Sequence, residues 1–156
     1  MEIRFAKPAD VPAILELLRL VGGVHNQGRP DIFRLGAQKY SASQVIAMLD
    51  DPTKPIFIAA EGDRVLGYGF CQVQVYEKDP VMTDRTEVYL DDLCVFENTQ
   101  NQGVGKSIYL AIRKYAQNRG CHSVTLNVWS FNEKAIRFYD KLGLTPRKIY
   151  LEDTLC

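Results

Sequence analysis

Residues 100–107, with the sequence QNQGVGKS, place two glycines directly before an amphipathic segment. An apolar run that contains Leu93 and Val95 precedes them. The first turn of a helix carries unpaired N–H groups and the positive end of the helix dipole, so it binds anions. Glycine at positions 103 and 105 would leave room for a phosphate to approach the backbone. We therefore predict a phosphate-binding loop formed by Gln100, Asn101, Gln102, Gly103, Val104, Gly105, Lys106 and Ser107.

One candidate for such a loop is the nucleotide P-loop, whose pattern is GxxxxGK[ST]. The end of the segment, Gly105-Lys106-Ser107, fits this pattern. The first glycine is missing, however, because position 100 is Gln. In addition, no apolar strand that ends in Asp follows the helix, as a magnesium-holding strand would. The sequence therefore disfavours a P-loop NTPase.

A second candidate accounts for the segment in full. The pattern Gln100-x-x-Gly103-x-Gly105 resembles the Q/R-x-x-G-x-G/A signature of the GNAT superfamily, the acetyl-CoA-dependent N-acetyltransferases. A later block, residues 132–144, resembles the superfamily motif N-x-x-A-x-x-x-Y-x-x-x-G-[FL]. The resemblance covers residues 86–151 well and the N-terminal part loosely. It implies acetyl-CoA as the cosubstrate, held where two parallel strands splay apart.

The resemblance also assigns roles to four further residues. The pantetheine arm of the cofactor would pair with backbone groups of Leu93 and Val95, and Asn132 would reach the same arm. Tyr139 would be the general acid, since a phenol with a pKa of about 10 is neutral at pH 7 and can donate to a departing thiolate. Ordinary structural roles stay open for two of them, because Asn caps helices well and a helical tyrosine can be a core aromatic.

Three carboxylates lie in the predicted strand before the loop, at Glu87, Asp91 and Asp92. An alkyl amine arrives protonated, so transfer to it needs a base. The two-residue period of a strand predicts Asp91 on one face and Asp92 on the other. Asp91 falls where polyamine acetyltransferases carry a glutamate, which makes it the first candidate base and Asp92 the second. Either residue could instead be a buried structural acid bonded to the backbone or to Arg.

A polar loop around His25 and Arg29 follows the first predicted helix, in the region that borders the acceptor pocket in the superfamily. Either side chain could bind substrate. We favour a simpler interpretation for Arg29, a local ion pair with Asp31.

Composition excludes several other classes of protein. The 156 residues predict a single domain, 1–156. Net charge is zero, from 19 basic and 19 acidic residues, which gives no reason to expect nucleic acid or a membrane surface as a partner. No apolar run approaches the ~18 residues of a membrane helix, so a cytoplasmic protein is the default expectation. The cysteines form no C-x-x-C pair and only His25 and His122 could assist them, so we expect no metal.

Hydrophobic periodicity and turn residues predict strands and helices along the whole chain. Their order predicts an α/β fold with a mixed, mostly antiparallel sheet flanked by about four helices, as the resemblance also implies. The predicted strands cover 3–5, 56–60, 65–76, 87–96, 123–129 and 145–151, and the predicted helices cover 10–20, ended by Gly22-Gly23, a short stretch after Ser41, 104–119 and 132–142.

These observations together predict an N-acetyltransferase that moves acetyl from acetyl-CoA to a primary amine by direct attack. The adjacent acids Asp91 and Asp92 suggest a small cationic acceptor. Two alternatives stay open, a peptide or protein amine as acceptor, and a noncatalytic acyl-CoA-binding module on the same fold. A homodimer is also left open.

Overall fold

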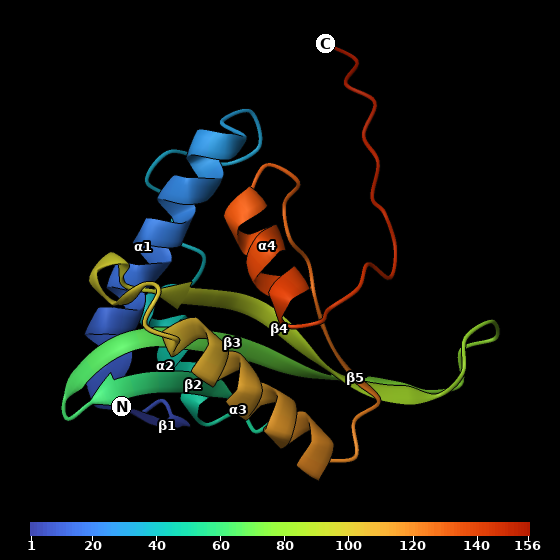
Figure 1. The fold of residues 1–156 in the computed structure, drawn as a ribbon. Helices are drawn as coiled ribbons and strands as arrows, with labels where there is room; N and C mark the ends of the chain where they lie inside the picture. Colours follow the sequence, from blue (N-terminus) through green and yellow to red (C-terminus); the bar gives the residue numbers. More distant parts are fainter.

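A computed structural model describes residues 1–156 and contains one five-stranded sheet in the order β1-β2-β3-β4-β5 (Figure 1). All neighbouring pairs are antiparallel except β4 and β5, which are parallel. The mixed, mostly antiparallel sheet predicted from the sequence is thus confirmed. The strands are β1 (Glu2–Phe5), β2 (Ile56–Glu61), β3 (Arg64–Tyr76), β4 (Arg85–Val95) and β5 (Ser123–Leu126).

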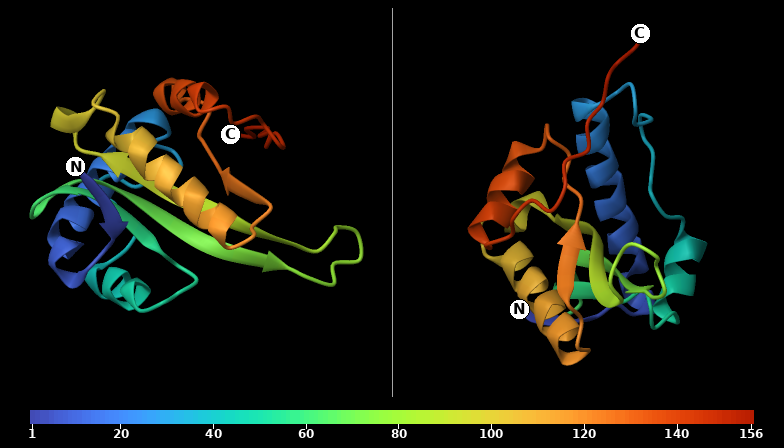
Figure 2. Two further views of the ribbon diagram at one scale, coloured as in Figure 1. Left: turned by 60° about the horizontal axis from the view of Figure 1, so that its bottom comes forward. Right: turned by 90° about the vertical axis from the view of Figure 1, so that its right-hand side faces the viewer.

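Helices cover both faces of the sheet. The helices α1 (Val11–Gly28) and α2 (Ala42–Leu49) lie on one face and α3 (Val104–Asn118) lies on the other, while α4 (Glu133–Lys141) lies beside the ends of β4 and β5 (Figure 2). Short 3-10 turns precede α1 and α3, at Pro8–Asp10 and Glu97–Thr99. A capping box begins α2, because the Ser41 hydroxyl accepts from the Gln44 N–H and the Gln44 side chain accepts from the Ser41 N–H. None of the helices is long and apolar enough to cross a bilayer.

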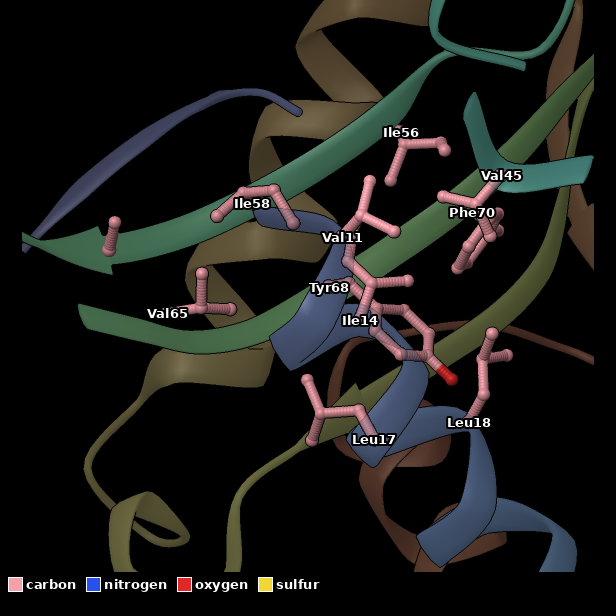
Figure 3. Close-up of a cluster of buried hydrophobic side chains, with 11 residues drawn as sticks. Val11, Ile14, Leu17, Leu18, Val45, Ile56, Ile58, Val65, Tyr68 and Phe70 are labelled. Atoms are coloured by element: carbon pink, nitrogen blue, oxygen red, sulfur yellow. The ribbon is translucent and has the colours of Figure 1, made fainter. Parts of the chain in front are cut away.

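The sheet separates two apolar cores of similar size. The core beneath α3 includes Val88 and Leu90 of β4, packed against Ile108 and Ile112. The core beneath α1 is shown in Figure 3, where Ile14, Leu17 and Leu18 of the helix meet side chains of β2 and β3. Tyr68 is fully buried there, and its hydroxyl lies at the edge of the cluster. A buried hydroxyl needs a polar partner, and this one finds it in the candidate site described below.

The parallel pair β4–β5 is short. Its register runs only from Glu87 opposite Ser123 to Leu90 opposite Leu126. Strand β4 continues to Val95, whereas the chain leaves β5 after Leu126, earlier than the predicted end at residue 129. The last residues of β4 therefore pair with β3 on one side and with no strand on the other.

Two other predictions of secondary structure are wrong. Helix α1 does not end at Gly22-Gly23 but continues to Gly28. A Cβ on Gly22 would lie 2.3 Å from the carbonyl oxygen of Ala37, so glycine serves close packing here rather than termination. The strand predicted at 145–151 does not form, and this segment runs along the outside of the molecule towards the C-terminus (Figure 1). Its apolar side chains Ile149, Tyr150 and Leu151 are exposed.

Candidate active site

The N-terminus of α3 has the features of an anion site. Gly103 is the N-cap residue, and no side chain caps the helix. The N–H groups of Gly103, Val104, Gly105 and Lys106 donate to no protein acceptor, and the first bond of the helix is from the Ser107 N–H to the Gly103 carbonyl. A helix start left in this state favours a negatively charged ligand.

The two glycines of the loop serve different purposes. Gly103 has a φ of 78°, and the preceding Asn101 a φ of 63°, so the loop turns through the left-handed region. That conformation costs a residue with a Cβ about 1–2 kcal/mol. A Cβ on Gly105 would instead lie 3.3 Å from the Phe138 ring, which shows that α3 and α4 pack closely at this point. Close helix packing, in addition to any ligand, therefore requires a small residue at 105.

The free edge of β4 supplies a second set of unpaired backbone groups. The Phe96 N–H donates to the Leu66 carbonyl, 3.0 Å away, so the backbone groups of residue 96 point towards β3. Alternate residues of an antiparallel strand point to opposite sides. The N–H and C=O of Leu93 and Val95 are thus directed away from β3, into the gap beside β5. An extended ligand arm could pair with them there, as the sequence predicted.

Asp91 and Asp92 lie at the point where β4 and β5 separate, directly after the last pair, Leu90 with Leu126. The prediction that they face opposite sides of the sheet is wrong. A β-bulge pairs Phe70 with Asp92 but Cys71 with Leu90, which leaves Asp91 as an extra residue. The bulge shifts the alternation by one residue. Both carboxylates consequently lie on the α1 side.

Contacts to the carboxylates confirm this arrangement. The Tyr40 hydroxyl donates to Asp91 Oδ2 at 2.5 Å, and the Lys39 ammonium lies 2.9 Å from Asp91 Oδ1. The Tyr68 hydroxyl donates to Asp92 Oδ2 at 2.8 Å. Glu87, the third carboxylate of the strand, is instead bonded by Arg85 and Arg147. Asp91 and Asp92 thus have different partners from the third carboxylate of the strand.

The two aspartates differ in electrostatic environment. Desolvation raises the pKa of Asp92 to about 6, and the hydrogen bond from Tyr68 only partly opposes it. Burial also raises the pKa of Tyr40 and of Tyr68, so both phenols stay protonated and serve as donors. Asp91 has an ammonium and a phenol as partners, whereas Asp92 has the phenol alone. A carboxyl group with a pKa near neutrality is suited to accept a proton during turnover.

Tyr139 of α4 packs against the core beneath α3. Burial raises the pKa of its phenol, with Asp92 as the second cause, so the group is protonated at neutral pH. Its hydroxyl makes no hydrogen bond within the protein and is left free to donate to a ligand. The side chain therefore serves the core and keeps the free proton that a general acid needs.

Asn132 is the N-cap of α4, with its Oδ1 accepting from the Ala135 N–H at 3.1 Å. Of the remaining loop residues, Gln100 accepts a hydrogen bond from Lys134 of α4, and Gln102 donates to the Asn98 carbonyl at 3.1 Å. The first contact joins the loop 100–107 to α4, and the second joins it to the 3-10 turn that precedes it.

A cavity of about 170 Å³ opens on the α1 side of Asp91 and Asp92, and we call it the acceptor cavity. Its walls come from the C-terminal half of α1 and from the irregular segment 29–41. Next to it, four aromatic rings gather at the end of α1; the Phe33 ring stacks on His25 at 4.8 Å and meets Trp129 edge-on at 4.9 Å. The lining residues are Leu18, Val21, Gly22, His25, Phe33, Ala37, Gln38, Lys39, Asp91 and Asp92.

Arg29 has no place in this lining. Its guanidinium pairs with Asp31, as predicted, and also with Glu152 of the C-terminal segment, both at 2.7 Å. All four cysteines are free, and no group of His, Cys, Asp and Glu side chains is arranged to hold a metal ion. The polar groups that the structure gathers around the gap are carboxylates, phenols and backbone N–H groups.

Comparison with known proteins agrees with this geometry. Residues 26–144 match the model of the acetyltransferase (GNAT) family. The chain belongs to this family. Members of the family use acetyl-CoA as cosubstrate, and the uncapped start of α3 and the free edge of β4 are features that suit its diphosphate and its pantetheine arm.

Individual relatives are distant in sequence. The chain is 34% identical over 84 residues to thialysine N-epsilon-acetyltransferase of Mus musculus, an alignment that covers 54% of this chain and 46% of the mouse protein. It is 28% identical over 155 residues to the uncharacterized N-acetyltransferase YhfO of Bacillus subtilis, covering 99% and 92%. Its structure resembles that of a mutant BH1408 protein from Bacillus halodurans, with a TM-score of 0.95, 29% identity and full coverage of both chains.

The partners of the two aspartates are the residues that sequence reasoning missed. Tyr68 lies in a strand and Lys39 and Tyr40 in an irregular segment, and none belongs to a motif. Tyr68 and Asp92 are 24 residues apart, and Tyr40 and Asp91 are 51 apart. The pairing of β3 with β4 places Tyr68 beside Asp92, and the packing of the segment 29–41 against β4 places Lys39 and Tyr40 beside Asp91.

Proposed function

We propose that this GNAT protein transfers acetyl from acetyl-CoA to the primary amine of a small cationic acceptor. The observation that carries the proposal is the position of Asp91 and Asp92, which line the acceptor cavity where β4 and β5 separate. The pantetheine arm of the cofactor lies in the gap between β4 and β5, and the amine enters from the acceptor cavity on the α1 side of the two aspartates. The cosubstrate supplies the acetyl thioester, and the protein supplies position, charge and proton transfer.

In this proposal the two aspartates divide the work. Asp91 binds the ammonium form of the acceptor, because its carboxylate already holds a cation in the Lys39 side chain. Asp92, with a pKa of about 6, accepts the proton that the amine loses before attack, directly or through water. The neutral nitrogen then attacks the thioester carbon without a covalent acyl-enzyme, the C–S bond breaks, and the Tyr139 hydroxyl gives its proton to the departing thiolate. The nitrogen loses its second proton as the amide forms, and this proton restores the Tyr139 phenol. Asn132, Leu93, Val95 and the loop 100–107 hold the cofactor.

The test is acetyl transfer measured over a panel of amines, with release of free CoA as the readout. We expect turnover with small cationic amines and little with uncharged hydroxyl compounds of the same size. Binding of CoA without turnover on any amine would favour the alternative, a noncatalytic acyl-CoA-binding module. Turnover on peptides alone would favour a protein acceptor, although the size of the acceptor cavity argues for a small molecule.

A homodimer has one supporting feature in the structure. The C-terminal segment exposes Ile149, Tyr150, Leu151 and Leu155, and β5 is an edge strand of the sheet. Unpaired strand edges and exposed apolar segments both favour association. We therefore propose that this segment of one copy covers the β5 edge of another, and sedimentation of the full chain against a chain truncated after Arg147 tests this.

A further inference from the structure

The acceptor cavity contains a cation of the protein itself. The Lys39 ammonium lies 2.9 Å from Asp91 Oδ1 and 3.3 Å from the Asp91 carbonyl oxygen. It is the one cationic side chain among the lining residues, since burial lowers the pKa of His25 and favours its neutral form. An incoming ammonium group must therefore compete with Lys39 for Asp91.

The ion pair between Lys39 and Asp91 can separate at a small cost in free energy. The Lys39 side chain is 46% exposed, whereas that of Asp91 is 9% exposed. Water screens the exposed ammonium, and holding a lysine side chain in one geometry costs entropy, so this pair contributes less stability than a fully buried one would. Lys39 also lies in the irregular segment 29–41, on a flexible four-carbon stem, so its ammonium can swing away from Asp91 while its backbone stays in place.

The charges of the cavity favour one kind of acceptor once Lys39 has been displaced from Asp91. An acceptor that is only cationic would exchange the Asp91 partner of Lys39 for water and place a like charge beside it. An acceptor that also carries a carboxylate would replace one ion pair by two, because its amine would take Asp91 and its carboxylate would take Lys39. The cavity has a volume of about 170 Å³. A cavity of about 150 Å³ holds benzene, so this one suits a small molecule that carries both an amine and a carboxylate.

We propose that the acceptor bears a carboxylate as well as the reacting amine, and that Lys39 binds this carboxylate after the amine has displaced it from Asp91. Lys39 is then a specificity residue that selects amino-acid acceptors over simple diamines. The inference rests on the proposed function, because it concerns the acceptor of the same transfer. The inference adds a carboxylate to the cationic acceptor of the proposed function, because an acceptor with an amine alone would give Lys39 no role in binding.

The test uses two acceptors that differ only in the carboxylate, ornithine and 1,4-diaminobutane. We expect the wild type to prefer ornithine in kcat/KM. Lys39→Met should lower that preference about tenfold, the usual size of a lost charge-assisted bond, because ornithine becomes a poorer acceptor and the diamine an equal or better one. Lys39→Arg should retain the preference. Lys114→Met, a change of an exposed lysine on α3, is the matched control and should have no effect.

Binding and folding measurements make the outcomes distinct. Calorimetry of both acceptors with the CoA-loaded protein should show the same change in preference as the kinetics, and Lys39→Gln replaces Lys39→Met if the latter does not fold. An unchanged preference in a folded Lys39 variant, or a wild type that prefers the diamine, would overturn the inference and leave the proposed function intact. A wild type that neither binds nor acetylates either amine would overturn both.

Discussion

The phosphate-binding loop comes from eight consecutive residues, 100–107, whereas the acceptor cavity is assembled from α1, the segment 29–41 and β4. The loop depends on local backbone conformation, a left-handed turn followed by an uncapped helix start. The cavity depends on a β-bulge and on hydrogen bonds between residues far apart in the chain. We therefore expect changes in the two regions to separate cofactor binding from acceptor chemistry.

Asp92→Asn should give the largest effect and should leave the cofactor half intact. Loss of a general base typically costs 10²–10⁴-fold, so we expect kcat/KM for the amine to fall about 10³-fold with CoA affinity unchanged. In the wild type, activity should rise as pH increases through about 6, because Asp92 must lose its proton before it can act as a base. The pH profile of the variant should lack this limb.

Asp91→Asn sharpens that prediction, because the bulge places Asp91 and Asp92 on the same side of the sheet. We expect it to raise the KM for the amine and to keep the limb near pH 6. The opposite result would contradict this assignment. If the rise in activity near pH 6 were kept in Asp92→Asn and lost in Asp91→Asn, Asp91 would be the base and Asp92 would bind the amine.

Tyr139→Phe should have the next largest effect. The ring is retained, so packing against the core beneath α3 should survive and the melting temperature should change little. Loss of the free hydroxyl should lower turnover by about 10²-fold, within the usual range for general acid catalysis. The loss should shrink for an acyl donor with a more acidic thiol, which leaves more easily. Wild-type turnover with every donor would make Tyr139 a core aromatic only.

Gly103→Val tests the cofactor half alone. The residue has a φ of 78°, and a Cβ there strains the backbone by about 1–2 kcal/mol, so we expect CoA to bind about tenfold more weakly by calorimetry. Gly120→Val is the matched control, because Gly120 has a φ of 68° and open space around it beyond the C-terminal end of the same helix. Both variants should lose similar stability. Equal CoA affinities in the two variants would contradict the assignment of the loop.

Gly22→Ala should give the smallest effect. It tests whether the packing of the segment 29–41 against α1 shapes the acceptor cavity. A Cβ at 22 would lie 2.3 Å from the Ala37 carbonyl oxygen, so the segment that carries Lys39 and Tyr40 must shift. Overpacking typically costs about 1–3 kcal/mol, and we expect the KM for the amine to rise by roughly fivefold with CoA affinity unchanged.

Gly23→Ala is the adjacent control, since a Cβ at Gly23 meets no atom within 4 Å. It should leave the KM for the amine at the wild-type value and raise stability slightly, because alanine favours the helix. Equal KM values in the Gly22 and Gly23 variants would show that the 29–41 segment does not shape the acceptor site.

The sequence by itself determined the features that depend on neighbouring residues. It predicted the family resemblance, most of the helices and strands, a glycine turn directly before α3 and the carboxylates beside the gap. The binding of a phosphate at that turn stays a prediction. Hydrophobic periodicity and the glycine pattern are local signals, so they can be found without the fold. The same local logic predicted a helix end at Gly22-Gly23 and a strand at 145–151, and both predictions were wrong.

Tertiary structure decided how the two aspartates are used. Their common orientation comes from the bulge opposite Phe70 and Cys71, which a two-residue period cannot reveal. The raised pKa of Asp92 comes from burial, and the partners Lys39, Tyr40 and Tyr68 are brought in by distant segments. Desolvation and pairing depend on what surrounds a side chain in space. The sequence could therefore name the two acids, but only the packed structure distinguishes the acid paired with an ammonium from the acid whose pKa is raised by burial.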